Sequence, residues 1–162
     1  MTRRMGVPVR VIPLALLLLG TALLLMGEGP VLSKGQTLYV PAYSHIYWGP
    51  KGRPFNLACT LSLRNTDPAA TVTVTSVEYY DTAGKRIRSY LEAPLSLGPL
   101  ATKEFYVEEE DTAGGSGANF LVRWSAPSPV NALLVECVMI GVRSGQGVSF
   151  TSRAREIAEP GK

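Results

Sequence analysis

Strict alternation of apolar residues with small or polar ones is the feature that most limits how this chain can fold. It is clearest over residues 56–65, where the apolar positions are Leu57, Cys59, Leu61 and Leu63. Successive side chains of a β-strand point to opposite faces of a sheet, so this pattern predicts a strand that buries one face. After residue 36 no segment has the apolar spacing expected of a helix of three turns.

Seven further segments share this extended character, and turn-forming residues separate them. The predicted strands cover residues 36–48, 56–65, 71–80, 85–91, 100–107, 118–124, 131–142 and 148–151. A change of phase predicts a bulge at Thr75–Ser76, residues 92–99 are expected to cross over without regular pairing, and residues 126–129 are expected to turn. These features predict an all-β, immunoglobulin-like antiparallel β-sandwich of about seven to nine strands, preceded by an N-terminal hydrophobic helix.

The N-terminal helix is predicted from an uncharged apolar run over residues 11–26, which follows Arg3, Arg4 and Arg10. Basic residues before an apolar run are typical of a secretory signal or a signal anchor. The run is shorter than the ~20 apolar residues that a membrane span requires, and Pro30 directly follows the small residues that a signal peptidase would need. A cleaved signal and an uncleaved anchor therefore both stay open. The chain divides into a signal peptide or anchor at 1–29, a spacer at 30–36, a β-sandwich at 37–157 and a frayed tail at 158–162.

The charge of the chain gives no support for nucleic-acid binding. The whole sequence has a formal net charge of +3, but residues 1–30 contain three Arg and only one Glu. The rest of the chain is therefore nearly neutral, whereas nucleic-acid binding needs a clustered basic face.

Two cysteines, Cys59 and Cys137, fall on predicted strands early and late in the sandwich, and both point inward by the parity of their positions. An exported protein meets oxidising conditions, so an inter-sheet disulfide between them is possible. The alternative is two buried free thiols that pack as small apolar groups.

Four segments resemble the recurring segments of DUF3124, a bacterial family of unknown function. They are residues 40–47, 61–66, 79–84 and 114–120, and the similarity extends over 38–157. The resemblance implies a cell-envelope protein without a known activity, and it assigns no catalytic residue. With the N-terminal run, it predicts a protein that is either anchored in the inner membrane and faces the periplasm or secreted to the periplasm. Its expected partners are the membrane, through the hydrophobic segment, and another envelope protein.

Few residues support an enzyme. His45 is the sole histidine and no Gly-x-Ser-x-Gly motif is present, so a hydrolase that uses His45 is the least favoured reading. No catalytic residue, metal site or cofactor is predicted. The acidic run 108–111 alternates between strand faces and cannot converge on a cation. The glycines of 114–117 precede a strand, whereas a phosphate loop precedes a helix.

Aromatic residues supply the remaining candidate site. Tyr43, His45, Tyr47 and Trp48 cluster in the sequence, and Asn119 follows the glycine-rich loop. Aromatic side chains with polar tips are favoured at binding surfaces, although they also cover sheet edges and lie at membrane surfaces. We therefore expect a non-enzymatic envelope protein that binds or scaffolds. The alternative is a periplasmic module that binds a small ligand or glycan through the segment 43–48.

Overall fold

The computed structural model describes residues 32–143 and 145–159 of the chain. The predicted N-terminal hydrophobic helix and signal segment at 1–29 lie outside the described residues, as do 160–162 of the predicted tail. Within the described ranges, no helix has the length and apolar character needed to cross a membrane.

The described residues contain twelve strands, and every pairing between these strands is antiparallel. They are β1 (Leu32–Pro41), β2 (His45–Trp48), β3 (Arg53–Asn56), β4 (Ala58–Arg64), β5 (Val72–Tyr80), β6 (Arg86–Ser89), β7 (Leu95–Leu97), β8 (Thr102–Val107), β9 (Asn119–Asn131), β10 (Leu134–Arg143), β11 (Gln146–Arg153) and β12 (Arg155–Ile157). The predicted all-β, antiparallel class is confirmed.

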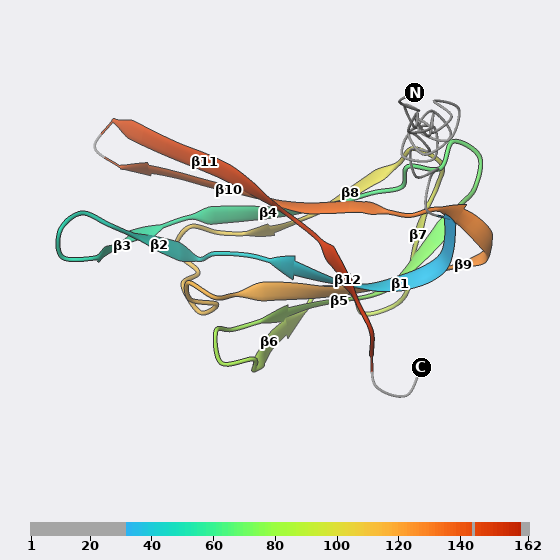
Figure 1. Cartoon of the computed structure of the whole chain (residues 1–162), viewed down its shortest axis with the longest axis horizontal. Coiled ribbons are helices and arrows are strands. Elements are labelled where there is room, and N and C mark those ends of the chain that lie inside the picture. Colours follow the sequence, from blue (N-terminus) through green and yellow to red (C-terminus); the bar gives the residue numbers. More distant parts are fainter. Residues whose placement is uncertain (1–31, 144, 160–162) are drawn as a thin grey trace, which may run out of the picture. The chain divides into compact units, whose positions relative to one another are not determined.

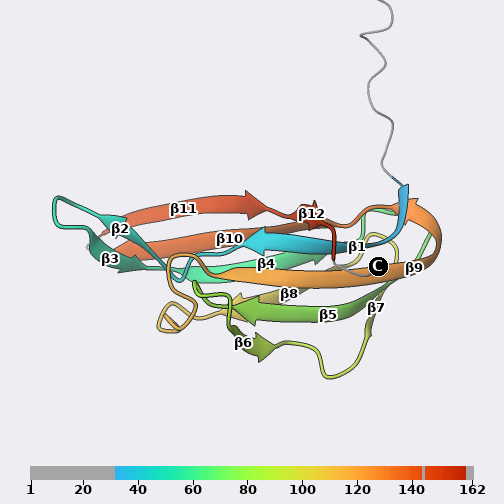
Figure 2. The same cartoon turned by 60° about the horizontal axis from the view of Figure 1, so that its bottom comes forward.

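The strands form two large sheets and one hairpin. One sheet has the order β12-β1-β9-β5-β6, with β7 also paired to β5, and the other has the order β11-β10-β4-β8. In Figure 1, β4, β8 and β10 run above β1, β5 and β9 as two layers. Strands β2 and β3 pair only with each other and project as a hairpin at the end opposite the start of β1, which Figure 2 shows from a second direction.

The core between the two layers follows the predicted alternation. Leu57, Leu61 and Leu63 on and beside β4 are fully buried, and Phe120 and Val122 of β9 approach them from the other sheet's core face. The inward positions predicted on β8 and β10 are also buried: Phe105, Val107, Val135, Cys137 and Met139. Burial of one face of each strand thus explains the period of two in the sequence.

Two local predictions are confirmed in detail. The register of β5 against β9 shifts between Val74 and Ser76, which is the predicted bulge. The turn at 81–84 joins β5 to β6, and Gly84 adopts a positive φ of 77° that few other residues tolerate. The Asp81 carboxylate accepts the N–H groups of Ala83 and Lys85 and so holds this turn.

Three segments that are predicted as a spacer or as loops lie wholly or partly within strands of the structure. β1 begins at Leu32, so most of the predicted spacer 30–36 belongs to the sheet; Leu32 pairs with Asn131. Residues 95–97, expected to cross over, form β7 and pair with β5. Residues 126–129, expected to turn, lie inside β9, where four residues bulge between the pairs Gly35–Ser125 and Ser33–Val130.

The described part of the predicted frayed tail contacts the sandwich. β12 pairs with β1 over three residues, and the Gln36 amide donates to Glu156 at 2.8 Å. Beyond β12, Glu159 forms an ion pair with Arg123 at 2.5 Å, and Arg123 also binds Glu78 at 2.7 Å. Arg123 of β9 thus contacts Glu159 within the tail that is predicted to fray, and fraying itself stays a prediction.

The cysteines do not face each other across the two sheets, so the predicted inter-sheet arrangement is wrong. Both are buried free thiols on neighbouring strands of one sheet: Cys59 pairs with Met139, and Cys137 pairs with Leu61. This register makes them diagonal neighbours, whose Cα atoms are typically ~7–8 Å apart. A disulfide normally needs less than ~7 Å, so a bond here would require the backbone to shift.

We expect both thiols to be unreactive in the folded protein. The hydrogen bond with Cys59, together with burial, raises the pKa of the Cys137 thiol, and the thiolate is the form that reacts. A thiol reagent should therefore label neither cysteine in native buffer and both in denaturant without reductant. If denaturation released no thiol, the two residues would be joined by a disulfide.

Asp67 should make the fold sensitive to acid. Its carboxylate accepts the N–H groups of Ala69, Ala70 and Asn131, and these hydrogen bonds lower its pKa. A carboxyl whose pKa falls on folding contributes stability above its unfolded pKa of ~3.9, and this contribution is lost as the pH falls through the folded pKa. In urea titrations, Asp67→Asn should lower the midpoint at pH 7 and remove part of the decline below about pH 4. An unchanged acid profile would contradict this role.

Candidate functional site

The candidate site is the projecting hairpin formed by β2 and β3. His45 pairs with Asn56 and Trp48 with Arg53, and residues 49–52 form the turn between them. Gly49 and Gly52 both adopt positive φ, 71° and 57°, and the Gly52 N–H donates to the Gly49 carbonyl at 3.1 Å. A Cβ atom at either position would contact no neighbouring atom. Glycine is therefore favoured here because of the positive φ, and not because a side chain would clash.

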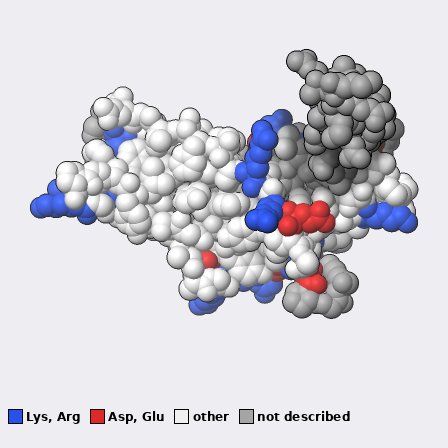
Figure 3. Space-filling model, viewed as in Figure 1, with Lys and Arg blue, Asp and Glu red and all other residues white. Residues whose placement is uncertain are grey.

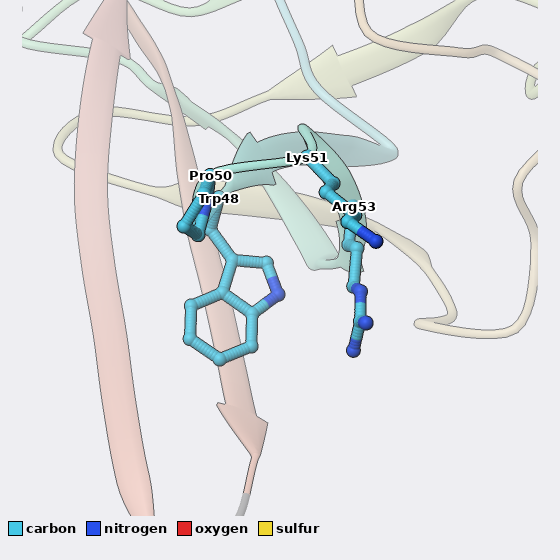
Figure 4. Close-up of a pocket in the computed structure, with 5 residues that line it drawn as sticks. Trp48, Pro50, Lys51 and Arg53 are labelled. Carbon is cyan, nitrogen blue, oxygen red and sulfur yellow. The ribbon is translucent and has the colours of Figure 1, made fainter.

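One face of this hairpin carries an indole ring beside two cations. Trp48, Lys51 and Arg53, with Gly49 and Pro50, line a pocket of about 290 Å³ at the tip. Trp48 and Arg53 face each other across the two strands, so their side chains share a face of the hairpin. Figure 4 shows the indole on one side of the pocket and the Lys51 and Arg53 side chains on the other. The indole is 48% exposed, so much of the ring is free for a ligand.

The Trp48 ring is fixed from its base by two neighbours. Phe55 of β3 meets it edge-on with ring centres 6.4 Å apart. Arg143, at the end of β10, places its guanidinium carbon 5.9 Å from the indole centre and donates to the Pro54 carbonyl at 3.3 Å. A guanidinium at this distance is attracted to the ring face. The indole therefore packs against Phe55 and has cations on more than one side.

The tip is basic and lacks nearby acidic side chains on the face that Figure 3 shows. Basic side chains mark the far left of that view, where Figure 1 places the β2–β3 hairpin, and no acidic side chain is visible there. Lys51 and Arg53 would attract an anionic group on this face. The acidic residue Glu109 lies beside β3, but it lines a separate pocket with Pro54 and Arg143. The exposed indole and the two cations can contact an apolar group and an anionic group at the same time.

The predicted aromatic cluster is divided between the two faces of the hairpin. The His45 and Tyr47 rings meet edge-on, with centres 5.2 Å apart, on the face opposite Trp48. Tyr43 precedes the hairpin and packs its ring against Phe150 of β11 at 5.6 Å. Tyr47 is 61% exposed, whereas Tyr43 and His45 are half-buried. The structure therefore assigns only Trp48 of the predicted residues to the pocket.

Asn119, the fifth predicted ligand residue, lies away from the pocket lining. It begins β9, between Pro41 of β1 and Tyr80 of β5. The preceding glycine-rich loop does run beside the start of the aromatic segment, because the Ser44 N–H donates to the Gly115 carbonyl at 3.0 Å. Asn119 is thus placed by sheet pairing and does not reach the hairpin tip.

The glycine-rich loop uses its polar groups for internal contacts. Thr82 donates its N–H and its hydroxyl to the Gly114 carbonyl, both at 3.0 Å, and accepts the Gly117 N–H. Beneath the loop, the Tyr79 hydroxyl pairs with the Ser44 hydroxyl at 2.9 Å, and burial raises the pKa of Tyr79 to about 12. The loop therefore fastens the β5–β6 turn to the sandwich, and its geometry offers no ligand cradle.

Neither the acidic run nor His45 forms a catalytic or metal centre among the described residues. Asp111 pairs with Arg88 at 2.8 Å, and across residues 32–143 and 145–159 no three His, Cys, Asp or Glu side chains are grouped to hold a metal ion. His45 contacts Tyr47, and in the same ranges no hydrogen bond joins its ring to a serine or a carboxylate. Among the described residues, His45 therefore has no hydrogen-bonded partner of the kind found in a hydrolytic triad.

Sequence reasoning missed the cationic half of the pocket. Residues 49–54 lie between two predicted strands and are rich in Gly and Pro, so their composition indicates a loop and does not group Lys51 and Arg53 with Trp48. The signal was present, because a four-residue turn between Trp48 and Arg53 makes the two residues cross-strand partners. Arg143 could not have been found this way, since it reaches the hairpin from a strand almost ninety residues further along the chain.

Comparison with known proteins yields a family and little else. A family model described as "Protein of unknown function (DUF3124)" matches residues 35–157. No curated protein matches the sequence. The crystal structure of Thermotoga maritima 1070 is similar over 74% of this chain and 92% of that chain, with 11% identity and a TM-score of 0.44. At this level the likeness supports no conclusion about the function of this chain.

Proposed function

The chain belongs to the DUF3124 family of proteins of unknown function, and from its hairpin site we propose that it is a non-enzymatic binding protein of the bacterial cell envelope. The observation that supports this proposal is the half-exposed Trp48 ring held beside Lys51 and Arg53 at the tip of a projecting hairpin. A protein that binds through a projecting tip presents its recognition surface clear of its own sandwich.

The chemistry of the pocket favours an acidic glycan as the ligand. An indole face packs against the apolar face of a sugar ring, and its area gives binding energy without a charged partner. Lys51 and Arg53 complement a carboxylate or phosphate substituent by charge-assisted hydrogen bonds. The volume of about 290 Å³ suits one or two sugar units rather than a longer enclosed ligand.

The position of the hairpin agrees with attachment through the N-terminus. β1 starts at the end of the sandwich opposite the hairpin (Figure 1). At ~3.3 Å per residue, the mostly extended backbone from Gly35 to Trp48 can span up to roughly 40 Å. An N-terminal anchor in the inner membrane would leave the tip free to reach a glycan in the periplasm.

The membrane part of this proposal has a direct test. An uncleaved anchor predicts that the protein stays with the membrane fraction after a high-salt wash, because apolar insertion does not depend on ionic strength. Recovery in the soluble fraction would favour a cleaved signal and release to the periplasm, which leaves the binding proposal intact.

The binding part is tested by calorimetric titration of the full chain with an oligogalacturonate and with a neutral oligosaccharide of equal length. We expect the acidic ligand to bind more tightly, with an affinity that falls as salt is added. Trp48→Ala should abolish detectable binding of both, whereas Tyr106→Ala, which removes a comparably exposed aromatic ring from β8, should not. Equal binding by the wild type and Trp48→Ala would refute the proposed site.

We also propose that the sandwich is related to immunoglobulin-like domains. In those domains strands B and E pair in one sheet and strands C and F in the other, and here β4 pairs with β8 and β5 with β9. One difference is that the consecutive strands β9 and β10 lie in different sheets. An experimental structure that lacked the β4–β8 or the β5–β9 pairing would contradict this relation.

A further inference from the structure

β11 is the least protected sheet edge in the described part of the chain. Sheet edges are normally shielded from other strands by short length or by charged residues. β12 has three residues and two charges, β6 has two arginines in four residues, and β8 carries Lys103 and Glu104. β11 runs for eight residues from Gln146 to Arg153 and has no charged residue before the last.

The edge is also open. Through residues 146–151, the described backbone pairing of β11 is with β10 alone. The other contacts of β11 do not use this stretch of edge backbone. Ser152, beyond the stretch, donates its hydroxyl to the Pro41 carbonyl, and Phe150 packs its side chain on Tyr43 at the inner face. The free N–H and C=O groups of this stretch are a template for another extended strand.

We propose that this edge pairs with β11 of a second copy of the chain, antiparallel about a two-fold axis. On such an axis each residue meets its own counterpart or a near neighbour, so a charged strand would oppose like charges. β11 avoids this cost because its middle contains only glycine, serine, threonine, valine and phenylalanine. An uncharged strand does not repel other strands, and for the same reason it can pair with the same strand of a second copy.

A two-fold axis at Ser149 satisfies the geometry best. It pairs residues 147–151 of the two copies with each other. It leaves Ser152 free to keep its bond to Pro41 and holds the two Arg153 side chains apart. Ser149 is exposed, so its side chain does not obstruct the approach. The dimer would join two four-stranded sheets into one continuous sheet of eight.

The surface beside the edge does not oppose this association. Ile140 and Val142 lie on the outward face of β10 and are 51% and 63% exposed. Figure 3 shows a wide uncharged surface, with basic side chains at its two ends, where Figure 1 places β4, β10 and β11. Since only about five residues of each strand pair, the contact area is small, and we expect a reversible dimer.

The test places a cysteine on the axis. In the full chain, Ser149→Cys should form a covalent dimer under mild oxidation, seen on a non-reducing gel, because cross-strand Cβ atoms lie ~4.5–5.5 Å apart. Thr102→Cys on the β8 edge is the matched control and should stay monomeric. The native cysteines are buried and should not contribute. If Ser149→Cys forms no more dimer than Thr102→Cys, the proposal is overturned. This result includes the case in which a segment of another protein occupies the edge.

A charge exchange provides an independent measure. Ser149→Lys and Ser149→Glu should each lower the dimer fraction at least tenfold by light scattering, and an equal mixture of the two should restore it through opposite charges on the axis. Failure of the mixture to associate, while each variant keeps its native strand signal in circular dichroism, would overturn pairing at Ser149. Both tests are independent of glycan binding, because β11 does not line the hairpin pocket.

Discussion

Replacing Phe120 by alanine should lower the free energy of unfolding by about 3–5 kcal/mol, the largest effect we expect from one substitution. Phe120 is fully buried in the middle of the core. Its ring centre lies 4.7 Å from that of Tyr79 and 5.8 Å from that of Tyr90. The substitution would remove both aromatic contacts and leave a cavity that strands fixed by pairing on both sides of β9 cannot close.

Denaturant titration of the purified full chain measures this loss. Tyr106→Ala is the matched control, because Tyr106 is an aromatic residue that is 56% exposed. It should change the free energy of unfolding by about 0.5 kcal/mol or less. A loss below about 1 kcal/mol for Phe120→Ala would mean that Phe120 does not occupy a close-packed core.

The second large effect concerns the hairpin. The double variant Lys51→Ala/Arg53→Ala should weaken binding of an oligogalacturonate at low salt by about 100-fold or more. Each charge-assisted hydrogen bond contributes about 1.5–3 kcal/mol, so the loss of two accounts for this factor. Binding of a neutral oligosaccharide to Trp48 should change little, because stacking on the indole does not need the cations.

A double variant with the same change in charge controls for net electrostatic attraction. Lys85→Ala/Lys103→Ala removes two exposed lysines that lie outside the pocket lining. It should reduce affinity only slightly, and less at physiological salt, where charges more than ~8 Å away are screened. Equal losses in the two double variants would show that general charge, and not the hairpin, attracts the ligand.

The strands could be predicted because burial of one face imposes a period of two. Leu57, Cys59, Leu61 and Leu63 repeat it without interruption. Even the bulge between Val74 and Ser76 is visible as a change of phase. Segments whose pairing does not depend on side-chain burial could not be predicted in this way. Residues 126–129 read as a turn but continue β9, and β12 is held by three backbone pairs with β1.

The site was less predictable than the fold, because it depends on which strands become neighbours. The alternation along each strand correctly predicted that Cys59 and Cys137 point inward. It could not predict that β4 and β10 lie in the same sheet. The aromatic residues were recognised as a group, yet strand alternation within β2 separates Tyr47 from Trp48. Arg143 joins Trp48 only because the ends of β10 and of the hairpin meet in the folded chain.

The indole N–H signals in a ¹H–¹⁵N NMR spectrum test the central claim most directly. The sequence contains two tryptophans; Trp48 is half-exposed in the pocket, whereas Trp124 is buried and donates to Gln36 at 3.3 Å. Trp48→Phe would assign the two signals. Titration with an oligogalacturonate should shift the Trp48 signal progressively and leave that of Trp124 unchanged. A Trp48 signal that stays in place while the ligand binds would contradict recognition at the hairpin.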